Sequence, residues 1–261
     1  MRFRYRKGFG VHSPFVYNLI TKVIEEKASF YAFEEIENFR EKLLNELNEL
    51  GRITAKETQS PNYGAFLFRL LNFFRCKSVI QIGSSTGVMS LYLASVSPVQ
   101  AECYFLEERP LLQEAEAFAV VHHLQKAHFV TGDYKEKLPK IKTLLPKAEM
   151  IFINQLPDSM EMEKVLAWVE DFSTPVSIVL VNGIKKKKIN SLWQRLKNLP
   201  QARVTMDLKV LGIVFFDNKL PKRHYNTHFN YGKKQNLYKN GRRRLHFIGR
   251  RKKGAENLST H

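Results

Sequence analysis

The sequence has few cysteines, no long apolar run and almost no acidic residues near its ends. Only two of its 261 residues are cysteines, Cys76 and Cys103, too few for a disulfide framework or a cysteine-rich zinc site. No apolar stretch approaches the roughly 18 residues that a membrane-spanning helix needs. The basic residues 1–7 are not followed by the apolar run of a secretory signal. These absences predict a protein of a reducing compartment, with the cytoplasm as the expected location and no membrane partner.

The positive charge is concentrated at the two ends of the chain. The formal net charge is +17, from 42 Lys and Arg against 25 Asp and Glu. Residues 1–7 carry four Lys or Arg and no acid, and residues 219–261 carry thirteen with the single acid Glu256. The intervening residues 8–218 are nearly neutral, and the chain is 44% hydrophobic, which excludes a wholly disordered protein. The charge pattern therefore predicts an ordinary globular body with basic extensions.

Hydrophobic periodicity predicts helices first and then an alternation of strands and helices. Apolar residues recur at three- and four-residue spacing in three early segments, the first preceded by Ser13 and Pro14, a typical helix start, and the second ended by Gly51. These helices are expected over residues 14–27, 34–50 and 62–74. Strands are expected over residues 78–82, 103–106, 127–130, 150–153, 176–181, 203–209 and 211–216, with helices over 87–95, 111–122, 134–145, 159–169 and 186–199.

This order of elements predicts an α/β fold. Five strand–helix units indicate a doubly wound, Rossmann-like sheet with right-handed crossovers. The last two strands follow one another directly, and a parallel crossover needs about a dozen residues, so the last strand is expected to be antiparallel. The prediction is a seven-stranded, mostly parallel sheet with an antiparallel last strand and N-terminal helices.

The residues that follow the first three strands are the candidate ligand-binding residues, because open parallel sheets bind ligands at the carboxyl ends of their strands. Residues 83–87, Gly-Ser-Ser-Thr-Gly, form a narrow loop between the first strand and a helix. Glu107 lies 20 residues beyond Gly87, where nucleotide-binding sheets place an acid against ribose hydroxyls. Asp133 follows the third strand, where it could flank an adenine ring or simply cap a helix.

With these motifs the sequence resembles the class I S-adenosylmethionine-dependent methyltransferases, and within them the small O-methyltransferases of the catechol type. The resemblance covers about residues 8–230 and includes residues 10–15, the loop at 82–87, Glu107, residues 132–134 and the closing strand pair with residues 211–216. It implies S-adenosylmethionine as cofactor and a domain division into a helical cap (1–59), a methyltransferase-like domain (60–217) and a basic tail (218–261). The cofactor-binding residues that it implies are Gly83, Ser84, Ser85, Gly87, Glu107, Asp133 and Asn154.

The sequence also departs from the catechol-type pattern. The loop motif begins with Gln81 where the family usually has an acid, and Asn154 and Asn182 stand where acidic metal ligands are expected. Two neutral amides supply no charge to offset the dehydration of Mg²⁺. We therefore expect no metal site and a metal-independent reaction, which needs a general base or an acceptor that is already nucleophilic. The candidate bases are His12, Asp158, Lys185 and His224, and no one of them is favoured over the others.

The acceptor and the activity itself stay open at this point. Lys185–Lys188 and the tail, whose cations alternate with aromatic residues, indicate RNA as acceptor or partner, and a small-molecule acceptor is the other interpretation. A basic extension that only aids solubility would look the same. The alternative function is a catalytically inactive, methyltransferase-like module that binds nucleic acid or protein. A nicotinamide-dependent enzyme is disfavoured by the strand order, and the sequence does not predict an oligomeric state.

Overall fold

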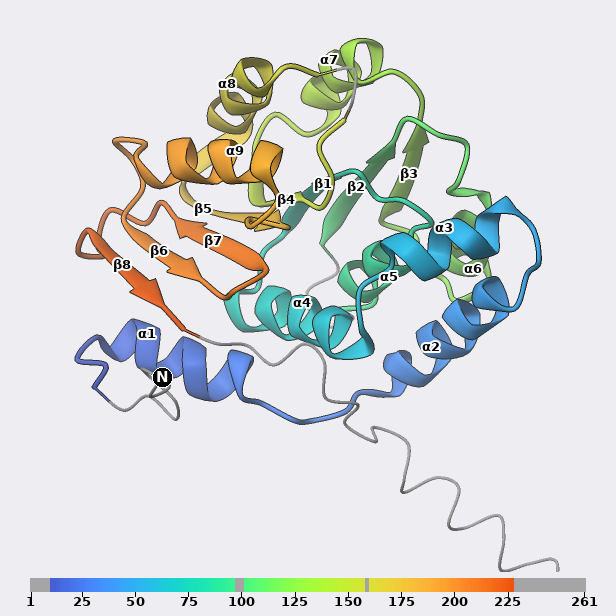
Figure 1. Ribbon diagram of the computed structural model, residues 1–261, viewed down its shortest axis with the longest axis horizontal. Coiled ribbons are helices and arrows are strands. Elements are labelled where there is room, and N and C mark those ends of the chain that lie inside the picture. Colours follow the sequence, from blue (N-terminus) through green and yellow to red (C-terminus); the bar gives the residue numbers. More distant parts are fainter. Residues whose placement is uncertain (1–9, 97–100, 158–159, 228–261) are drawn as a thin grey trace, which may run out of the picture.

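The computed structural model describes residues 10–96, 101–157 and 160–227, in which an eight-stranded sheet is covered by helices on both faces (Figure 1). The order of the strands across the sheet is β3-β2-β1-β4-β5-β7-β6-β8. Their bounds are β1 Ser78–Ile82, β2 Glu102–Glu107, β3 Ala127–Thr131, β4 Ala148–Ile153, β5 Ser173–Asn182, β6 Val204–Asp207, β7 Leu211–Phe215 and β8 Arg223–Asn226. Strands β1 to β5 pair in parallel, and β7 pairs antiparallel with both β5 and β6. The predicted doubly wound sheet with an antiparallel closing strand is confirmed.

Alternate side chains of the central strands belong to two separate hydrophobic cores. On one face, Val79, Phe105 and Phe152 pack with the N-terminal helices and with α4 (Pro61–Phe74) and α5 (Val88–Ala94). On the other face, Ile80 and Leu106 belong to the core formed with three later helices, α7 (Tyr134–Leu144), α8 (Met162–Phe172) and α9 (Lys187–Lys197). A parallel strand that is buried on both faces has to be apolar throughout, which explains the short apolar runs in the sequence.

The helices match the predicted order, with one difference near the N-terminus. Their bounds are α1 Pro14–Leu19 with the π-helical continuation η2 Ile20–Ile24, α2 Tyr31–Leu44, α3 Glu49–Glu57, α4 Pro61–Phe74, α5 Val88–Ala94, α6 Gln113–Val121, α7 Tyr134–Leu144, α8 Met162–Phe172 and α9 Lys187–Lys197. The single helix expected over residues 34–50 is in fact two helices, α2 and α3. Within the described ranges, no helix combines the length and the apolar character needed to cross a bilayer.

Gly51 does not end a helix, as the sequence suggested, but lies in the first turn of α3. The side chain of Asn48 caps this helix by accepting a hydrogen bond from the Gly51 N–H at 3.2 Å. A Cβ atom on Gly51 would lie 1.9 Å from the carbonyl oxygen of Glu46 in the preceding turn. The glycine is therefore required by the close approach of the turn between α2 and α3, a tertiary contact that periodicity does not reveal.

The sheet has one strand more than predicted, because β8 lies in the segment expected to be a basic tail. Strand β8 pairs in parallel with β6, and the N–H of Thr227 donates to the carbonyl of Asp207 at 2.9 Å. Tyr225 is buried while its neighbours Arg223, His224 and Asn226 are exposed. A four-residue edge strand with one apolar residue has too weak a pattern to be recognised within a basic sequence. The remaining tail, from residue 228, lies outside the described residues.

Candidate functional site

The loop between β1 and α5 has the sharp backbone that its glycines predict. Gly83 and Gly87 have φ of +71° and +78°, and Ser85 between them also has a positive φ of +55°. The N–H groups of Gly83 and Ser84 both lie 3.0 Å from the carbonyl oxygen of Leu106. The loop is therefore joined to the end of β2, next to the candidate acid.

Glu107 lies at this junction, as its 20-residue spacing from Gly87 predicts. The residue is only 4% exposed, and its Oε2 atom accepts a hydrogen bond from the Ser85 N–H at 2.6 Å. Its Oε1 atom accepts from Arg109, at 2.9 Å from Nε and 3.3 Å from the backbone nitrogen. A carboxylate that is removed from water needs such partners, so the loop and Arg109 together stabilise its charge.

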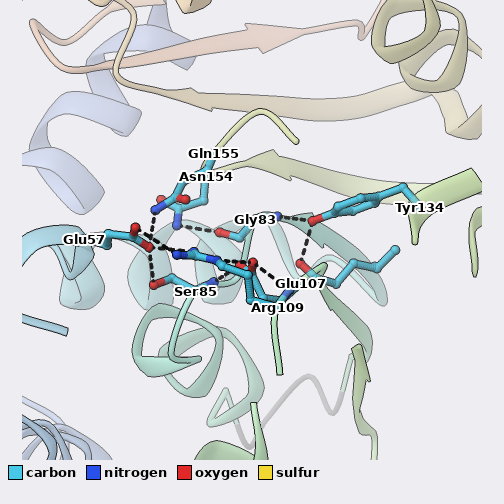
Figure 2. A network of polar contacts seen from close by, with 9 residues as sticks. Glu57, Gly83, Ser85, Glu107, Arg109, Tyr134, Asn154 and Gln155 are labelled. Atoms are coloured by element: carbon cyan, nitrogen blue, oxygen red, sulfur yellow. Dashed lines mark hydrogen bonds and ion pairs between the residues drawn. The ribbon is translucent and has the colours of Figure 1, made fainter. Parts of the chain in front are cut away.

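Arg109 bridges Glu107 to a second carboxylate, Glu57, at the end of α3 (Figure 2). The Nη1 and Nη2 atoms of Arg109 lie 3.1 and 2.8 Å from Glu57 Oε1 and Oε2. Glu57 Oε2 also accepts from the Ser85 hydroxyl at 2.8 Å and from Gln155 Nε2 at 3.0 Å. Glu57 thus joins the loops that follow β1, β2 and β4, and we call Glu57, Arg109 and Glu107 the carboxylate bridge.

Sequence reasoning missed Glu57, Arg109 and Gln155 as members of this site. Glu57 belongs to a helix that was not predicted, and the other two residues follow strands without being part of a motif. The one available signal was position, because Arg109 and Gln155 both lie just past the carboxyl ends of central strands.

The contacts of the bridge shift the pKa values of Glu57 and Arg109. Burial alone would raise the pKa of Glu57, but the hydrogen bonds from Arg109, Gln155 and Ser85 outweigh it and lower the pKa to about 2. The hydrogen bonds that Arg109 donates to Glu57 raise its pKa, against the opposing effect of burial. Glu57 is therefore an anion and Arg109 a cation at neutral pH.

The depressed pKa of Glu57 predicts how the stability of the bridge depends on pH. Its folded-state pKa of about 2 lies below the ordinary value of 4.5, so the stabilisation is complete above pH 4.5 and is lost as the pH falls from there through about 2. Glu57→Gln should therefore lower the free energy of unfolding at about pH 7 and lower it by clearly less at about pH 3. Urea denaturation of both proteins at the two pH values measures this. A difference that stays the same at both values would contradict it.

Of the residues that follow β3, the structure brings Tyr134 rather than the predicted Asp133 to the glycine loop. The hydroxyl of Tyr134 accepts from the Gly83 N–H at 3.0 Å and donates to the Leu106 carbonyl at 3.1 Å, and burial raises its pKa. Asp133 is exposed and caps α7 by accepting from the Lys135 N–H at 2.7 Å. The geometry of Asp133 is that of a helix cap.

The amides of Asn154 and Asn182, where metal ligands were considered, are hydrogen-bonded in series. Asn182 Nδ2 donates to Asn154 Oδ1 at 3.0 Å, and Asn154 Nδ2 donates to the carbonyl of Gly83 at 2.8 Å. Both residues are buried. Among the described residues, no group of three or more His, Cys, Asp or Glu is placed to hold a metal ion. This donor set does not fit the divalent metal of the catechol-type enzymes, since it offers no charged oxygen.

The four candidate bases lie in different parts of the chain. His12 lies near the amino edge of the sheet, as the contacts of Phe15, three residues further on, show. The ring of Phe15 lies 5.9 Å from that of Phe74 and 5.0 Å from that of Phe215, measured between centroids. His224 lies on β8, five strands from β1 and thus roughly 24 Å away at the usual spacing. Neither histidine is at the carboxyl edge near Gly83. Lys185 is exposed just after β5, at that edge, and Asp158 lies outside the described residues.

Comparison with solved structures finds methyltransferases among the chains of similar fold. An O-methyltransferase from Bacillus cereus in complex with S-adenosylhomocysteine is 16% identical with a TM-score of 0.54, covering 77% of this chain and 96% of that one. A methyltransferase from Podospora anserina, also bound to S-adenosylhomocysteine, is 14% identical with a TM-score of 0.58, covering 74% and 90%. An O-methyltransferase from Streptomyces achromogenes involved in tomaymycin synthesis, in complex with S-adenosylmethionine, is 13% identical with a TM-score of 0.53, covering 76% and 93%.

Sequence comparisons give no nearer relative: no family model matches the chain, and no curated protein does. The structural likeness spans nine-tenths or more of each of these three neighbours. The sheet of this chain is mostly parallel and is closed by the antiparallel strand β7. The chain therefore has the fold of the class I methyltransferases.

Proposed function

We propose that this protein is an S-adenosylmethionine-dependent methyltransferase. The observation that carries the proposal is the contact between Glu107 and the glycine loop, in which the buried carboxylate accepts from the Ser85 N–H. This is the place where nucleotide-binding sheets hold a ribose diol. Neighbours of the same fold that bind S-adenosylmethionine or S-adenosylhomocysteine support the proposal.

The residues at the loop fit this cofactor on one condition, which is that Arg109 leaves Glu107. A carboxylate can accept two hydrogen bonds from a vicinal diol, and in this structure Arg109 uses the acceptor Oε1. The side chain of Arg109 is 39% exposed, so its guanidinium can turn out into solvent. Ser84 Oγ is buried and has no hydrogen-bond partner among the described residues, which leaves a polar group available at the loop.

In this proposal each part of the site has a separate task. Glu107 binds the ribose, and residues 83–87 lie against the methionine portion. Asn154 holds the carbonyl of Gly83 and so orients the loop. When bound, the cofactor supplies an activated methyl group. The chain positions the acceptor against this methyl group and removes the acceptor's proton where the acceptor carries one.

We further propose that the reaction does not use a metal. The amides of Asn154 and Asn182 are engaged with one another and with the backbone of Gly83, and neither carries charge. Acceptor activation then depends on a protein base or on an acceptor that is nucleophilic without help. Lys185 supports a protein base, because it is exposed just after β5 at the carboxyl edge of the sheet.

For the acceptor we propose a small molecule, in keeping with the O-methyltransferases that share the fold. An RNA acceptor is the second candidate. The exposed residues Lys185–Lys188 support it, because they lie just after β5 at the carboxyl edge of the sheet. Strand β8 ends at the same edge, so the basic sequence beyond residue 227 begins there.

A catalytically inactive, methyltransferase-like binding module is the alternative function. The observation that favours it is the carboxylate bridge, in which Arg109 already donates to both oxygens of Glu57 and to Oε1 of Glu107. A chain that had lost its cofactor would need such an internal counter-ion for two neighbouring carboxylates.

Isothermal titration calorimetry with S-adenosylmethionine separates the two functions. The enzyme is expected to bind it with a dissociation constant on the order of micromolar. This corresponds to a favourable binding free energy of about 8 kcal/mol. S-adenosylhomocysteine should bind at the same stoichiometry, and NAD is the control ligand that should give no heat. The absence of binding for both sulfur nucleosides, at any reachable concentration, would leave the binding module as the function.

A further inference from the structure

The loop that follows β1 is bordered by two carboxylates and one guanidinium. Arg109 donates through Nε to Glu107 and through both Nη atoms to Glu57, so its single positive charge lies between two negative ones (Figure 2). The side chains of Glu57 and Glu107 are 19% and 5% exposed. Removal of Arg109 would leave two poorly hydrated anions facing one another, which attracts a cation of similar size to the same place.

Glu57 is held over the cofactor site although it comes from a helix outside the sheet. Its remaining hydrogen bonds come from the Ser85 hydroxyl in the glycine loop and from Gln155 after β4. These two partners hold the carboxylate in place when the arginine departs. The end of β1 itself contributes no charge, because the amide of Gln81 is neutral. This side chain is fully buried, and its Oε1 atom accepts from the Ser90 hydroxyl at 3.0 Å.

S-adenosylmethionine has the charge and the shape to replace Arg109. Its methionine end carries an ammonium, a sulfonium and a carboxylate, for a net charge of +1, equal to that of the guanidinium. Its ribose supplies hydroxyl donors in place of the Nε–H that Glu107 loses when the guanidinium of Arg109 leaves. The exchange therefore conserves the charge of the site and keeps both carboxylates hydrogen-bonded.

We propose that Glu57 binds the cationic methionine end of the cofactor, and that Arg109 occupies this place in the cofactor-free protein. The inference rests on the proposed function, since it names a further binding residue at the same site. It makes Glu57 a determinant of specificity for a positively charged nucleoside. S-adenosylhomocysteine, which lacks the sulfonium, and 5′-methylthioadenosine, which is uncharged, should depend on it less.

Calorimetry with these three ligands tests the inference without requiring activity. Glu57→Gln should weaken S-adenosylmethionine binding by about tenfold or more, as expected for a charged hydrogen bond, and should leave 5′-methylthioadenosine unchanged or tighter. Arg109→Gln should tighten S-adenosylmethionine binding, because the internal competitor is gone. Glu49→Gln and Arg52→Gln are matched controls, since this exposed pair lies 2.6 Å apart on the same helix. Neither control should change the affinity for S-adenosylmethionine or for 5′-methylthioadenosine.

The outcomes distinguish the two proposals. In Glu57→Gln, an equal loss of affinity for S-adenosylmethionine and for 5′-methylthioadenosine, or no loss for either, would overturn the role of Glu57. The methyltransferase proposal would remain intact. If neither the natural protein nor Arg109→Gln binds any of the three ligands, the proposed function fails and the inference with it. If only Arg109→Gln binds S-adenosylmethionine, and the double variant with Glu57→Gln does not, the inference is confirmed. Circular dichroism and thermal unfolding of each variant show that the fold is retained.

Discussion

Glu107→Gln is expected to weaken the binding of S-adenosylmethionine by about a hundredfold or more. A carboxylate accepts both hydroxyls of a ribose, each as a charged hydrogen bond worth about 1.5–3 kcal/mol, and an amide offers only one neutral acceptor oxygen. A loss of about 3 kcal/mol corresponds to roughly two orders of magnitude in affinity. Calorimetry of the natural protein and the variant measures the effect directly.

The same substitution should weaken 5′-methylthioadenosine to a similar extent, because both ligands contain the ribose. This separates Glu107 from Glu57, whose substitution is expected to weaken S-adenosylmethionine and not 5′-methylthioadenosine. Glu102→Gln is the matched control, since Glu102 lies at the opposite end of the same strand, β2. An undiminished affinity in Glu107→Gln would mean that the buried carboxylate only orders the loop through Ser85 and Arg109.

Gly83→Ala should destabilise the fold by about 3 kcal/mol or more. A positive φ costs an L-residue roughly 1–2 kcal/mol, and Gly83 has φ of +71°. A Cβ atom there would also lie 2.7 Å from both the backbone nitrogen and the backbone oxygen of Gln155. Because backbone atoms cannot move aside as a flexible side chain can, the clash adds to the conformational cost. In a domain of this size the melting temperature should fall by about 10 °C.

Gly10→Ala isolates the conformational part of that effect. Gly10 has nearly the same φ, +75°, but a Cβ atom on it would meet no atom of the described residues within 4 Å. Its substitution should cost no more than about 1–2 kcal/mol. Equal shifts in melting temperature for the two variants would show that the Gln155 backbone does not press on the loop as the structure indicates.

The close approach at Gly83 also refines what the glycine loop does. The conformation of the loop is required by contacts within the protein. Its N–H groups donate to Leu106 and Tyr134, and the side of Gly83 that lacks a Cβ atom lies against Gln155. A glycine motif in this position is therefore explained by packing alone, and ligand binding has to be argued from the side chains. For this chain those side chains are the members of the carboxylate bridge.

How far the sequence leads can be followed at individual residues. Glu107 was identified because β2 and the β1 loop are neighbours in any doubly wound sheet, so spacing along the chain determines contact in space. Asp133 was considered on the same ground, but spacing could not show that Tyr134, one residue later, is the side chain that turns toward Gly83. The direction in which a side chain points depends on its packing in the folded protein, and packing does not follow the period of the sequence pattern.

The sequence by itself determined the fold class, the antiparallel closing strand and the meeting of the glycine loop with Glu107. These depend on local periodicity and on crossover rules that hold for every sheet of this type. Only the tertiary structure decided that Gly51 lies inside a helix, that β8 joins the sheet, and that Glu57 and Arg109 come together at the loop. Glu57 and Arg109 are 52 residues apart in the chain, and their contact requires α3 to pack beside the carboxyl edge of the sheet. No spacing rule connects them, because the approach of a helix to a sheet edge is determined by the shape of the whole core.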